Sequence, residues 1–390
     1  MAGRSSIKGQ LHSTSAEPER ALLIAVETSG GSHEWAAEDS LAELARLTET
    51  AGAVVAGVEV QRLGSPSGTH YVGRGKLQQL QEMKGSLNYS LLIADDELSP
   101  RQQRTLEEEL DVQVIDRTAL ILDIFAHQAR TREGKLQVEL AQHRYLLPRL
   151  IGKWEHLERL GGGIGTRGPG ESQLETDRRL IRLRIKRLED DLEAVRRHRE
   201  VYRSRRRREA VPLVAFVGYT NAGKSTLFNA VTQAGVPAAD RLFSTLDPIT
   251  RRIRLPGGSA ALVTDTVGFI HKLPPSIIAA FRTTLEELDE ADALLHVVDI
   301  THRDAARQHA TVEQILRDIG LASKPVVTAL NKCDLLEGWS ATEPGAMAYE
   351  RLGAARTDFV AVSAVTGWNV GELLECVERV LSNPSTSQPR

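Results

Sequence analysis

The chain has 390 residues, 41% of them hydrophobic, and a formal net charge of −3. This length predicts about two or three domains, and no apolar stretch approaches the roughly 20 residues that a membrane-spanning helix needs. The polar start lacks a signal-peptide core, and the two cysteines, Cys333 and Cys376, form no metal-type pair and suggest reduced thiols. We therefore expect a cytoplasmic protein without a membrane span, acting as a monomer. The net charge by itself indicates nothing about a nucleic-acid partner.

The first 130 residues predict a tail followed by a small parallel α/β domain. Residues 1–20 are rich in Ser and Gly and are expected to be disordered. From 21 to 130, short apolar runs alternate with helical patterns, which is typical of a parallel sheet covered by helices. The expected strands are Ala21–Glu27, Ala53–Val60, Ser90–Asp95 and Asp111–Asp116, and the expected helices are Glu38–Thr50, Lys76–Lys84 and Pro100–Leu110. A Gly/basic turn, Tyr71–Lys76, is either an anion site or an ordinary turn.

Residues 131–210 predict a long antiparallel helical hairpin. Apolar residues recur every three to four positions in 133–160 and form a heptad seam in 174–202. Pro148 should bend or interrupt the first helix. The seam positions are Leu136, Leu140, His143, Leu147, Ile151, Trp154 and Leu157 on the first helix, and Leu174, Ile181, Ile185, Leu188, Leu192, Val195 and Tyr202 on the second.

The second of these helices is strongly basic. Between Arg178 and Arg208 there are 14 Arg and Lys against 5 Asp and Glu, and the run ends in Arg205, Arg206, Arg207 and Arg208. A solvated helical face is the simpler interpretation. The local excess of positive charge nevertheless favours a polyanion, with RNA as the first candidate.

The connection between the two helices, 161–171, contains six glycines in eleven residues. Such a segment cannot form a core and should be flexible at the tip of the hairpin. Its backbone amides and Arg167 can approach RNA phosphates, and Gly161, Gly162 and Gly163 are included in this predicted contact. The alternative is a plain linker, although antiparallel helices need only a few connecting residues.

A further domain is expected over 211–382, and it begins with a phosphate loop. Leu213–Val217 is a buried-strand pattern, and Gly218-x-x-x-x-Gly223-Lys224-Ser225 follows it before a helix. In this spacing backbone N–H groups wrap a phosphate chain, Lys224 reaches the β- and γ-phosphates, and the Ser225 hydroxyl binds Mg²⁺. The predicted loop contacts are Gly218, Tyr219, Thr220, Asn221, Ala222, Gly223, Lys224 and Ser225. The sequence therefore predicts a nucleoside triphosphate site.

Guanine specificity is predicted by a second motif. The strand pattern Lys324–Leu330 runs into Asn331, Lys332, Cys333 and Asp334. The Asp334 carboxylate can accept hydrogen bonds from N1–H and the exocyclic amine of guanine, a donor pair that adenine lacks. Lys332 can lie over the purine, and Asn331 should join this loop to the phosphate loop. After a third strand, Phe359–Val362, the backbone amides of Ser363, Ala364 and Val365 are candidates to support the guanine O6.

Two further segments supply a metal ligand and two switches. The strand pattern Ala260–Val263 leads to Asp265, Thr266, Val267 and Gly268, in which Asp265 should hold Mg²⁺ through water and the Gly268 N–H should sense the γ-phosphate. Upstream lies the loop Phe243, Ser244, Thr245, Leu246 and Asp247. We expect Thr245 on Mg²⁺ and the γ-phosphate, the alternative being an ordinary loop threonine. Lys224, Thr245 and Gly268 form the predicted catalytic set.

Phe269 stands where many GTPases carry a Gln that orients the attacking water. A phenyl ring cannot hydrogen-bond water, so hydrolysis should be slow until a partner or another group completes the site. Asn221, inside the phosphate loop, suggests K⁺ as a second ion beside the phosphates.

Five segments together resemble the HflX family of ribosome-associated GTPases: Tyr71–Lys76, Asp95–Pro100, Arg130–Leu140, Gly161–Glu171 and Gly218–Asn229. The resemblance implies an α/β fold in which a small parallel α/β domain and a long antiparallel helical hairpin precede a Ras-like P-loop GTPase domain. It also implies binding of GTP and GDP and of the large (50S) ribosomal subunit with its rRNA, with the hairpin loop near the peptidyl-transferase region. Separation or rescue of ribosomes and a part in ribosome biogenesis would follow. Because 383–390 is a polar tail, the additional C-terminal domain of some relatives is expected to be absent.

Two alternative functions remain at this stage. One is a signalling switch whose GTP state recruits a protein, with the arginines merely solvating a coiled coil. The other is a dual nucleotidase in which the N-terminal domain binds ATP. Salt dependence of RNA binding separates the first from a ribosome factor.

Overall fold

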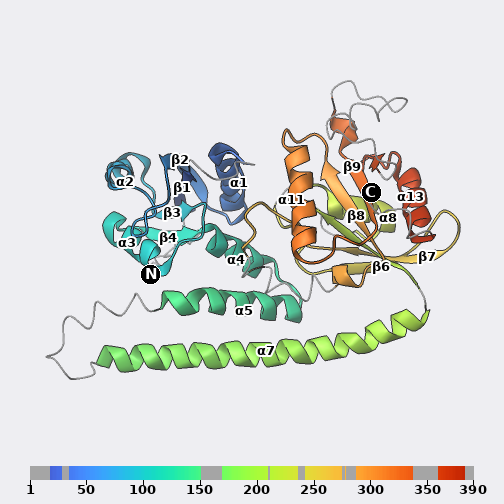
Figure 1. Cartoon of the computed structure of the whole chain (residues 1–390), viewed down its shortest axis with the longest axis horizontal. Helices are drawn as coiled ribbons and strands as arrows, with labels where there is room; N and C mark the ends of the chain where they lie inside the picture. Colours follow the sequence, from blue (N-terminus) through green and yellow to red (C-terminus); the bar gives the residue numbers. More distant parts are fainter. Residues whose placement is uncertain are drawn as a thin grey trace, which may run out of the picture.

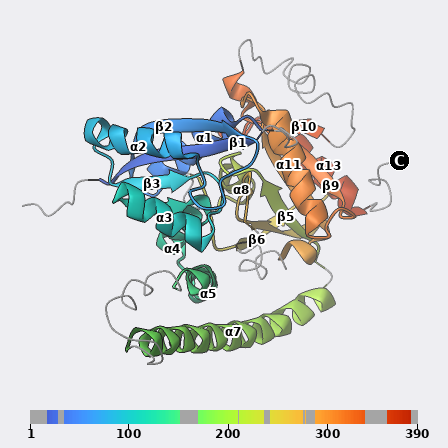
Figure 2. The same cartoon turned by 60° about the vertical axis from the view of Figure 1, so that its left-hand side comes forward.

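The computed structural model describes residues 18–28, 35–150, 169–209, 211–235, 242–274, 277, 287–336 and 359–382. Two α/β units lie side by side, and the long helix α7 (Pro169–Glu209) runs below them (Figures 1 and 2). Along α7, side chains are described from 175 to 197. No helix in the described ranges is long and apolar enough to cross a membrane.

The first unit is a four-stranded, fully parallel sheet in the order β2-β1-β3-β4. Strands β1 and β3 are buried almost throughout, whereas the edge strand β2 is partly exposed and carries polar residues. The predicted alternation of strands and helices is confirmed, with one further helix, α4, after the last strand. The elements are β1 (Arg20–Thr28), α1 (Ala37–Thr50), β2 (Val54–Leu63), α2 (Arg74–Leu87), β3 (Leu91–Ala94), α3 (Pro100–Leu110), β4 (Gln113–Asp116) and α4 (Arg117–Gln128).

Helix α5 (Arg132–Arg149) packs against α7, which runs back along it (Figure 1). Leu140 and Leu188 of the predicted seam are buried, and salt bridges Arg144–Glu189 and Arg184–Glu139, each 2.6 Å, flank the contact. Pro148 lies in the last turn of α5, and the helix ends one residue later. Proline favours such an end because it has no backbone N–H to donate to the preceding turn. The seam positions from 151 to 160 and the tip residues 161–168 lie outside the described residues.

The second unit is a six-stranded sheet in the order β10-β9-β8-β5-β7-β6, parallel except for β6. Strand β5 lies between β8 and β7 in the sheet. The loop after β5 therefore leaves the sheet at a point where the chain connections diverge to opposite sides, and ligands typically bind at such points. Strand β8 and helix α11 were not expected from the sequence. The elements are β5 (Leu213–Gly218), α8 (Lys224–Thr232), β6 (Ile249–Arg254), β7 (Ala260–Asp265), β8 (Ala293–Asp299), α11 (Ala305–Asp318), β9 (Val326–Asn331), the 3₁₀ turn η1 (Cys333–Leu335), β10 (Phe359–Ala361) and α13 (Val370–Ser382).

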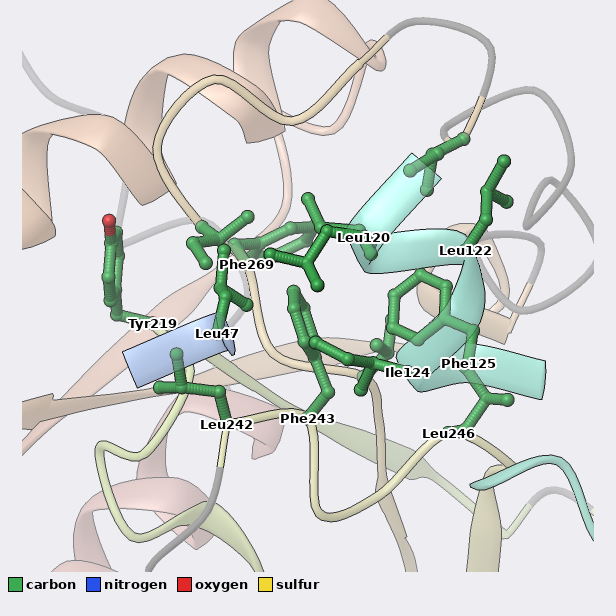
Figure 3. Close-up of a cluster of buried hydrophobic side chains, with 14 of the residues drawn as sticks. Leu47, Leu120, Leu122, Ile124, Phe125, Tyr219, Leu242, Phe243, Leu246 and Phe269 are labelled. Carbon is green, nitrogen blue, oxygen red and sulfur yellow. The ribbon is translucent and has the colours of Figure 1, made fainter. Parts of the chain in front are cut away.

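The two units share one hydrophobic core. Leu120 and Phe125 of α4 meet Phe243 and Phe269 of the second unit (Figure 3), and all four side chains are buried. The rings of Phe125 and Phe243 pack edge to face with centroids 4.7 Å apart. Continuous apolar packing of this kind joins the units more firmly than a polar surface contact would.

Candidate functional site

The phosphate loop connects β5 to α8 in the strand–loop–helix order that its sequence predicts. Gly223 has φ +91°, and a Cβ there would lie 2.3 Å from Asn331 Nδ2, so glycine is required on both counts. The Lys224 ammonium is buried and donates to the carbonyls of Gly218 (3.1 Å) and Tyr219 (2.9 Å). Burial lowers the pKa of Lys224 to about 8, against a smaller opposite effect of Asp265. A buried cation thus faces the loop interior, where anionic phosphates would neutralise it.

A small cavity lies between the phosphate loop and the two predicted switch segments. It has a volume of about 40 Å³. Its lining is formed by Thr220, Asn221, Gly223, Lys224, Ser225, Thr226, Phe243, Ser244, Thr245, Thr266 and Gly268. The structure therefore brings the first switch loop, the second switch segment and the phosphate loop to one place.

Three oxygen-bearing side chains converge beside this cavity. Ser225 Oγ lies 2.7 Å from Thr245 Oγ1 and donates to Asp265 Oδ2 at 2.6 Å, and Thr245 Oγ1 donates to the same oxygen at 3.0 Å. The other carboxylate oxygen, Asp265 Oδ1, is buried and has no hydrogen-bond partner among the described residues. Burial raises the pKa of Asp265, against the hydrogen bonds from Ser225 and Thr245 and the charge of Lys224. Two hydroxyls and a carboxylate with a spare oxygen suit Mg²⁺, which prefers oxygen ligands.

The predicted base-recognition loop has a matching geometry. Asn331 Nδ2 donates to the Ala222 carbonyl (3.0 Å), and Asn331 Oδ1 accepts from the Ala364 N–H (3.0 Å), so one side chain joins three loops. Lys332 Nζ donates to the Asn221 carbonyl at 3.0 Å and pairs with Asp299 at 2.7 Å. Asp334 Oδ1 is buried and unpaired within the part of the chain that the structure describes. An acceptor held without a donor suits the two N–H groups of guanine.

The second switch segment is held close to the phosphate loop. At Gly268, a Cβ would lie 2.7 Å from Thr220 Cα and 2.9 Å from Lys224 Nζ, so any side chain would fill the cradle. Phe269 donates its N–H to the Gly218 carbonyl (3.0 Å) and accepts from Thr220 N–H (2.7 Å). Its ring lies in the core shared by the two units (Figure 3).

Several residues of the predicted GTP-binding set direct their side chains elsewhere. Those of Phe243, Leu246 and Val267 belong to the shared core, and Cys333 is buried in a separate cluster, where its thiol donates to the Leu330 carbonyl (3.1 Å). Burial raises the pKa of the Cys333 thiol to about 11. A contact between these residues and a nucleotide would therefore have to use their backbone. Ser363 is buried, and Val365 is 77% exposed.

Asp247 and Tyr219 differ most from their expected place. The carboxylate of Asp247 accepts from the N–H groups of Arg130 and Thr131, both at 2.9 Å, at the start of α5, rather than facing the phosphates, where like charge would repel it. The Tyr219 hydroxyl donates to Glu43 of α1 and accepts from the His271 N–H at 2.8 Å. Neither contact was expected from the sequence, although Arg130 and Thr131 lie in the segment Arg130–Leu140, which carries part of the family resemblance.

The predicted RNA contacts are not described at the level of side chains. Gly161, Gly162, Gly163 and Arg167 lie outside the described residues, and Arg205–Arg208 fall on α7 beyond its described side chains.

Three family models cover most of the chain: "GTP-binding GTPase N-terminal" matches residues 38–126, "GTP-binding GTPase Middle Region" 128–206 and "50S ribosome-binding GTPase" 213–332. The GTPase HflX of Caldanaerobacter subterraneus subsp. tengcongensis is 50% identical over 321 residues, which cover 82% of this chain and 74% of that protein. The chain belongs to the HflX family of GTPases. GTPase HflX of Escherichia coli (strain K12) is 44% identical over 88% of this chain and 79% of its own length.

As an HflX GTPase, the protein hydrolyses GTP. Among solved structures, a GTP-binding protein of Sulfolobus solfataricus in complex with GDP is 26% identical over 94% of this chain and 100% of that chain, with a TM-score of 0.46. The HflX assignment rests on the sequence matches, which extend over both units and the helices between them.

Proposed function

We propose that this HflX GTPase is a cytoplasmic, monomeric factor that binds the large (50S) ribosomal subunit, is activated by it, and separates or rescues ribosomes, with a part in ribosome biogenesis. Residues 21–130 and 131–210 serve as an N-terminal domain and a ribosome-contacting hairpin, and 211–382 as the GTPase domain. The description "50S ribosome-binding GTPase" of the family model matching 213–332 supports the choice of partner.

The observation that carries this proposal is the position of Phe269. The residue after Gly268 would orient the attacking water, but here it is a phenyl ring buried in the core between the units. Rotation of that ring toward the phosphates would leave an apolar gap in the core and still supply no hydrogen bond. Hydrolysis is therefore slow in the free protein, and a group from the ribosome completes the site.

The remaining roles follow from the site. Lys224 neutralises the β- and γ-phosphates, the Gly268 N–H binds the γ-phosphate, and Asp334 selects guanine. Mg²⁺ would be held by the Ser225 and Thr245 hydroxyls and, through water, by Asp265, and it would neutralise charge between the β- and γ-phosphates. The short Oγ–Oδ2 contacts among these side chains support one shared ion site.

K⁺ is a second proposed ion. Asn221 lies inside the phosphate loop with a left-handed backbone (φ 63°), and its side-chain amide oxygen is the candidate ligand for a monovalent cation beside the phosphates. Turnover should be higher in K⁺ than in Na⁺ at equal ionic strength, and equal rates would reject this ion.

The hairpin is assigned to rRNA. The basic excess of α7 and its exposed arginines, including Arg182 and Arg187, form a positively charged face that suits phosphates. In this proposal Arg205–Arg208 anchor the protein, whereas Gly161–Gly163 and Arg167 act at the functional centre that the tip reaches.

The proposal is tested by measuring GTP turnover while large subunits are titrated. We expect a rise of at least about tenfold, equivalent to about 1.4 kcal/mol of barrier. Subunit pelleting with GTP, GDP and a non-hydrolysable GTP analogue should show the strongest binding with the analogue. Unchanged turnover across the titration would reject the ribosome as activator.

Two matched variants separate binding from action. Replacement of Arg205–Arg208 by Ala should weaken ribosome binding and flatten its dependence on salt, since fewer counterions are released. Shortening 161–170 to a tight turn should preserve GTP binding and much of the ribosome binding but abolish subunit separation in sucrose gradients. A shortened protein that separates subunits as well as the parent would make the tip a linker.

The alternative functions predict other results. A protein-recruiting switch predicts that ribosome binding is absent or insensitive to salt. ATP binding by the N-terminal unit is disfavoured because the carboxyl end of β3 carries Asp95 and Asp96, which already pair with Lys272, and carboxylates repel a triphosphate.

A further inference from the structure

The loop that carries Thr245 is held on two sides. On the nucleotide side, Thr245 Oγ1 lies with Ser225 and Asp265 at the proposed metal site. Two residues further along the chain, the Asp247 side chain is directed away from this site and contacts the start of helix α5. Because two residues of extended chain span at most about 7 Å, a displacement of Thr245 beyond that reach must move Asp247 as well.

Asp247 is bound at α5 by three donors. Its Oδ2 accepts from the N–H groups of Arg130 and Thr131 at 2.9 Å each, and its Oδ1 accepts from the Thr131 hydroxyl. Thr131 is also the N-cap of α5, since its Oγ1 accepts from the Gly134 N–H at 3.0 Å. A carboxylate bonded to backbone N–H groups at the positive end of a helix dipole is stabilised by charge as well as by hydrogen bonding.

Gly134 shows how closely the loop approaches the helix. A Cβ at this position would lie 2.3 Å from Asp247 Oδ1 and 3.3 Å from its Cγ. Gly134 has an ordinary helical backbone within α5, where alanine would be preferred for helix stability by about 1 kcal/mol. Glycine at this place is therefore explained by the approach of Asp247 and not by backbone conformation.

We propose that Asp247 is a positioning residue that couples the Thr245 loop to helix α5, and through α5 to the hairpin. This inference rests on the proposed role of Thr245 at the metal. When GTP and its metal hold Thr245, the Asp247 carboxylate is hydrogen-bonded at the N-terminus of α5. When Thr245 moves away from the metal site, these hydrogen bonds break. By linkage the coupling is reciprocal, so a partner that shifts α5 changes the affinity for GTP by the same factor.

Two variants test the contact in the absence of ribosomes. Asp247→Ala removes the acceptor, and Gly134→Ala keeps the acceptor but displaces it. Each should lower the affinity ratio of a non-hydrolysable GTP analogue over GDP by about fivefold or more, the lower end of typical coupling, with GDP affinity nearly unchanged. Ser99→Ala is the matched control, because it removes a side-chain N-cap from a different helix, α3.

Gly134→Ala also distinguishes coupling from helix strength. If Asp247 does not matter, this variant strengthens α5 and leaves the ratio intact; if it matters, the ratio falls even though α5 gains a better helix former. Amide hydrogen exchange over 132–139 should differ between GDP and the GTP analogue in the parent and in Ser99→Ala. The difference should vanish in Asp247→Ala.

A parental affinity ratio in both variants, or an undiminished exchange difference in Asp247→Ala, would overturn the coupling. The two proposals can fail separately. If ribosomes neither bind nor stimulate the parent protein, but Asp247→Ala still lowers the affinity ratio of the GTP analogue over GDP, the ribosomal function is rejected and the coupling is retained.

Discussion

Lys272 of the second unit reaches Asp95 at the carboxyl end of β3 in the first unit, with Nζ 2.5 Å from Oδ2. Asp95 is buried and also pairs with Arg117 at 2.7 Å, and Lys272 pairs with Asp96 at 2.6 Å. Burial raises the pKa of Asp95, but Arg117 and Lys272 outweigh it and hold that pKa below the usual value. The segment that follows Gly268 is thus fixed to the N-terminal unit by charge as well as by the ring of Phe269.

Lys272→Met should reduce the free energy of unfolding by about 1–2 kcal/mol. The loss leaves Asp95 buried with one cation fewer, but Lys272 is about one-third exposed and solvent screens part of the interaction. Urea unfolding followed by circular dichroism measures the change. Arg303→Ala is the control, since Arg303 pairs with Asp39 across the same two units while 70% exposed, and should change stability by less than about 0.5 kcal/mol. Equal effects of the two variants would contradict the assigned burial.

Phe269→Gln should not raise the turnover of the free protein. The introduced amide would enter the core between the units rather than the phosphate site, so we expect turnover within about threefold of the parent, or less than 1 kcal/mol of barrier. Stability should fall by about 2–4 kcal/mol, because a polar group replaces a buried ring. Phe269→Leu keeps an apolar side chain in the core and should reduce stability clearly less than Phe269→Gln. A large gain in intrinsic turnover for Phe269→Gln would show that this side chain reaches the attacking water.

Asp334→Asn should change the base preference of the site from guanine to xanthine. Asp334 Oδ1 is a buried acceptor that would face the two donors of guanine, and an amide at this position would present a donor instead. GTP affinity should fall by about 30-fold or more, equivalent to about 2 kcal/mol for lost bonds to a charged group. Competition with GTP and XTP measures the change, with exposed Leu335→Ala as control. Parallel changes in GTP and XTP affinity would refute the base assignment.

GTP binding should weaken above pH 8. The free-protein pKa of Lys224 is lowered to about 8 by burial, so the lysine is charged below this pH and neutral above it. Phosphate binding requires the charged form, and each pH unit above 8 should therefore reduce affinity by up to about tenfold until the pKa of the bound lysine is reached. Lys224→Arg, whose side chain stays charged, should bind more weakly but with a flat pH profile. A flat profile in the parent would indicate a lysine of ordinary pKa.

Removal of Mg²⁺ should distinguish the two hydroxyl ligands. Chelation should weaken binding of GTP more than that of GDP, because Mg²⁺ would neutralise the charge of the γ-phosphate, which GDP lacks. Thr245→Ala should lower affinity for the GTP analogue while sparing GDP, whereas Ser225→Ala should impair both. Ser86→Ala, at an exposed position of α2 outside the nucleotide site, is the control. Equal loss of both nucleotides in Thr245→Ala would remove Thr245 from the γ-phosphate.

Patterns of hydrophobicity predicted most of the fold. The strands β1, β3, β5 and β7 are apolar runs of the kind that a parallel, buried sheet requires, and α3 begins at Pro100 as expected. Strand β8 and helices α4 and α11 were not expected, since without a motif an apolar run fits a buried strand or a buried helix equally well.

The sequence by itself determined the nucleotide chemistry. Gly223, Lys224 and Ser225 are adjacent along the chain, so their geometry is set by a local turn and needs little from the rest of the fold. The tie from Asn331 to the Ala222 carbonyl was also foreseen, because loops after neighbouring parallel strands meet at one edge of the sheet.

The tertiary structure alone decided where the switch residues point. Phe269 could be recognised as unable to orient water, but its burial against α4 depends on packing between segments more than a hundred residues apart. Asp247 was expected near the phosphates and instead binds α5 at Arg130 and Thr131. A side chain in a loop has no periodicity to assign its direction, so the donors that satisfy it become apparent when distant elements are brought together.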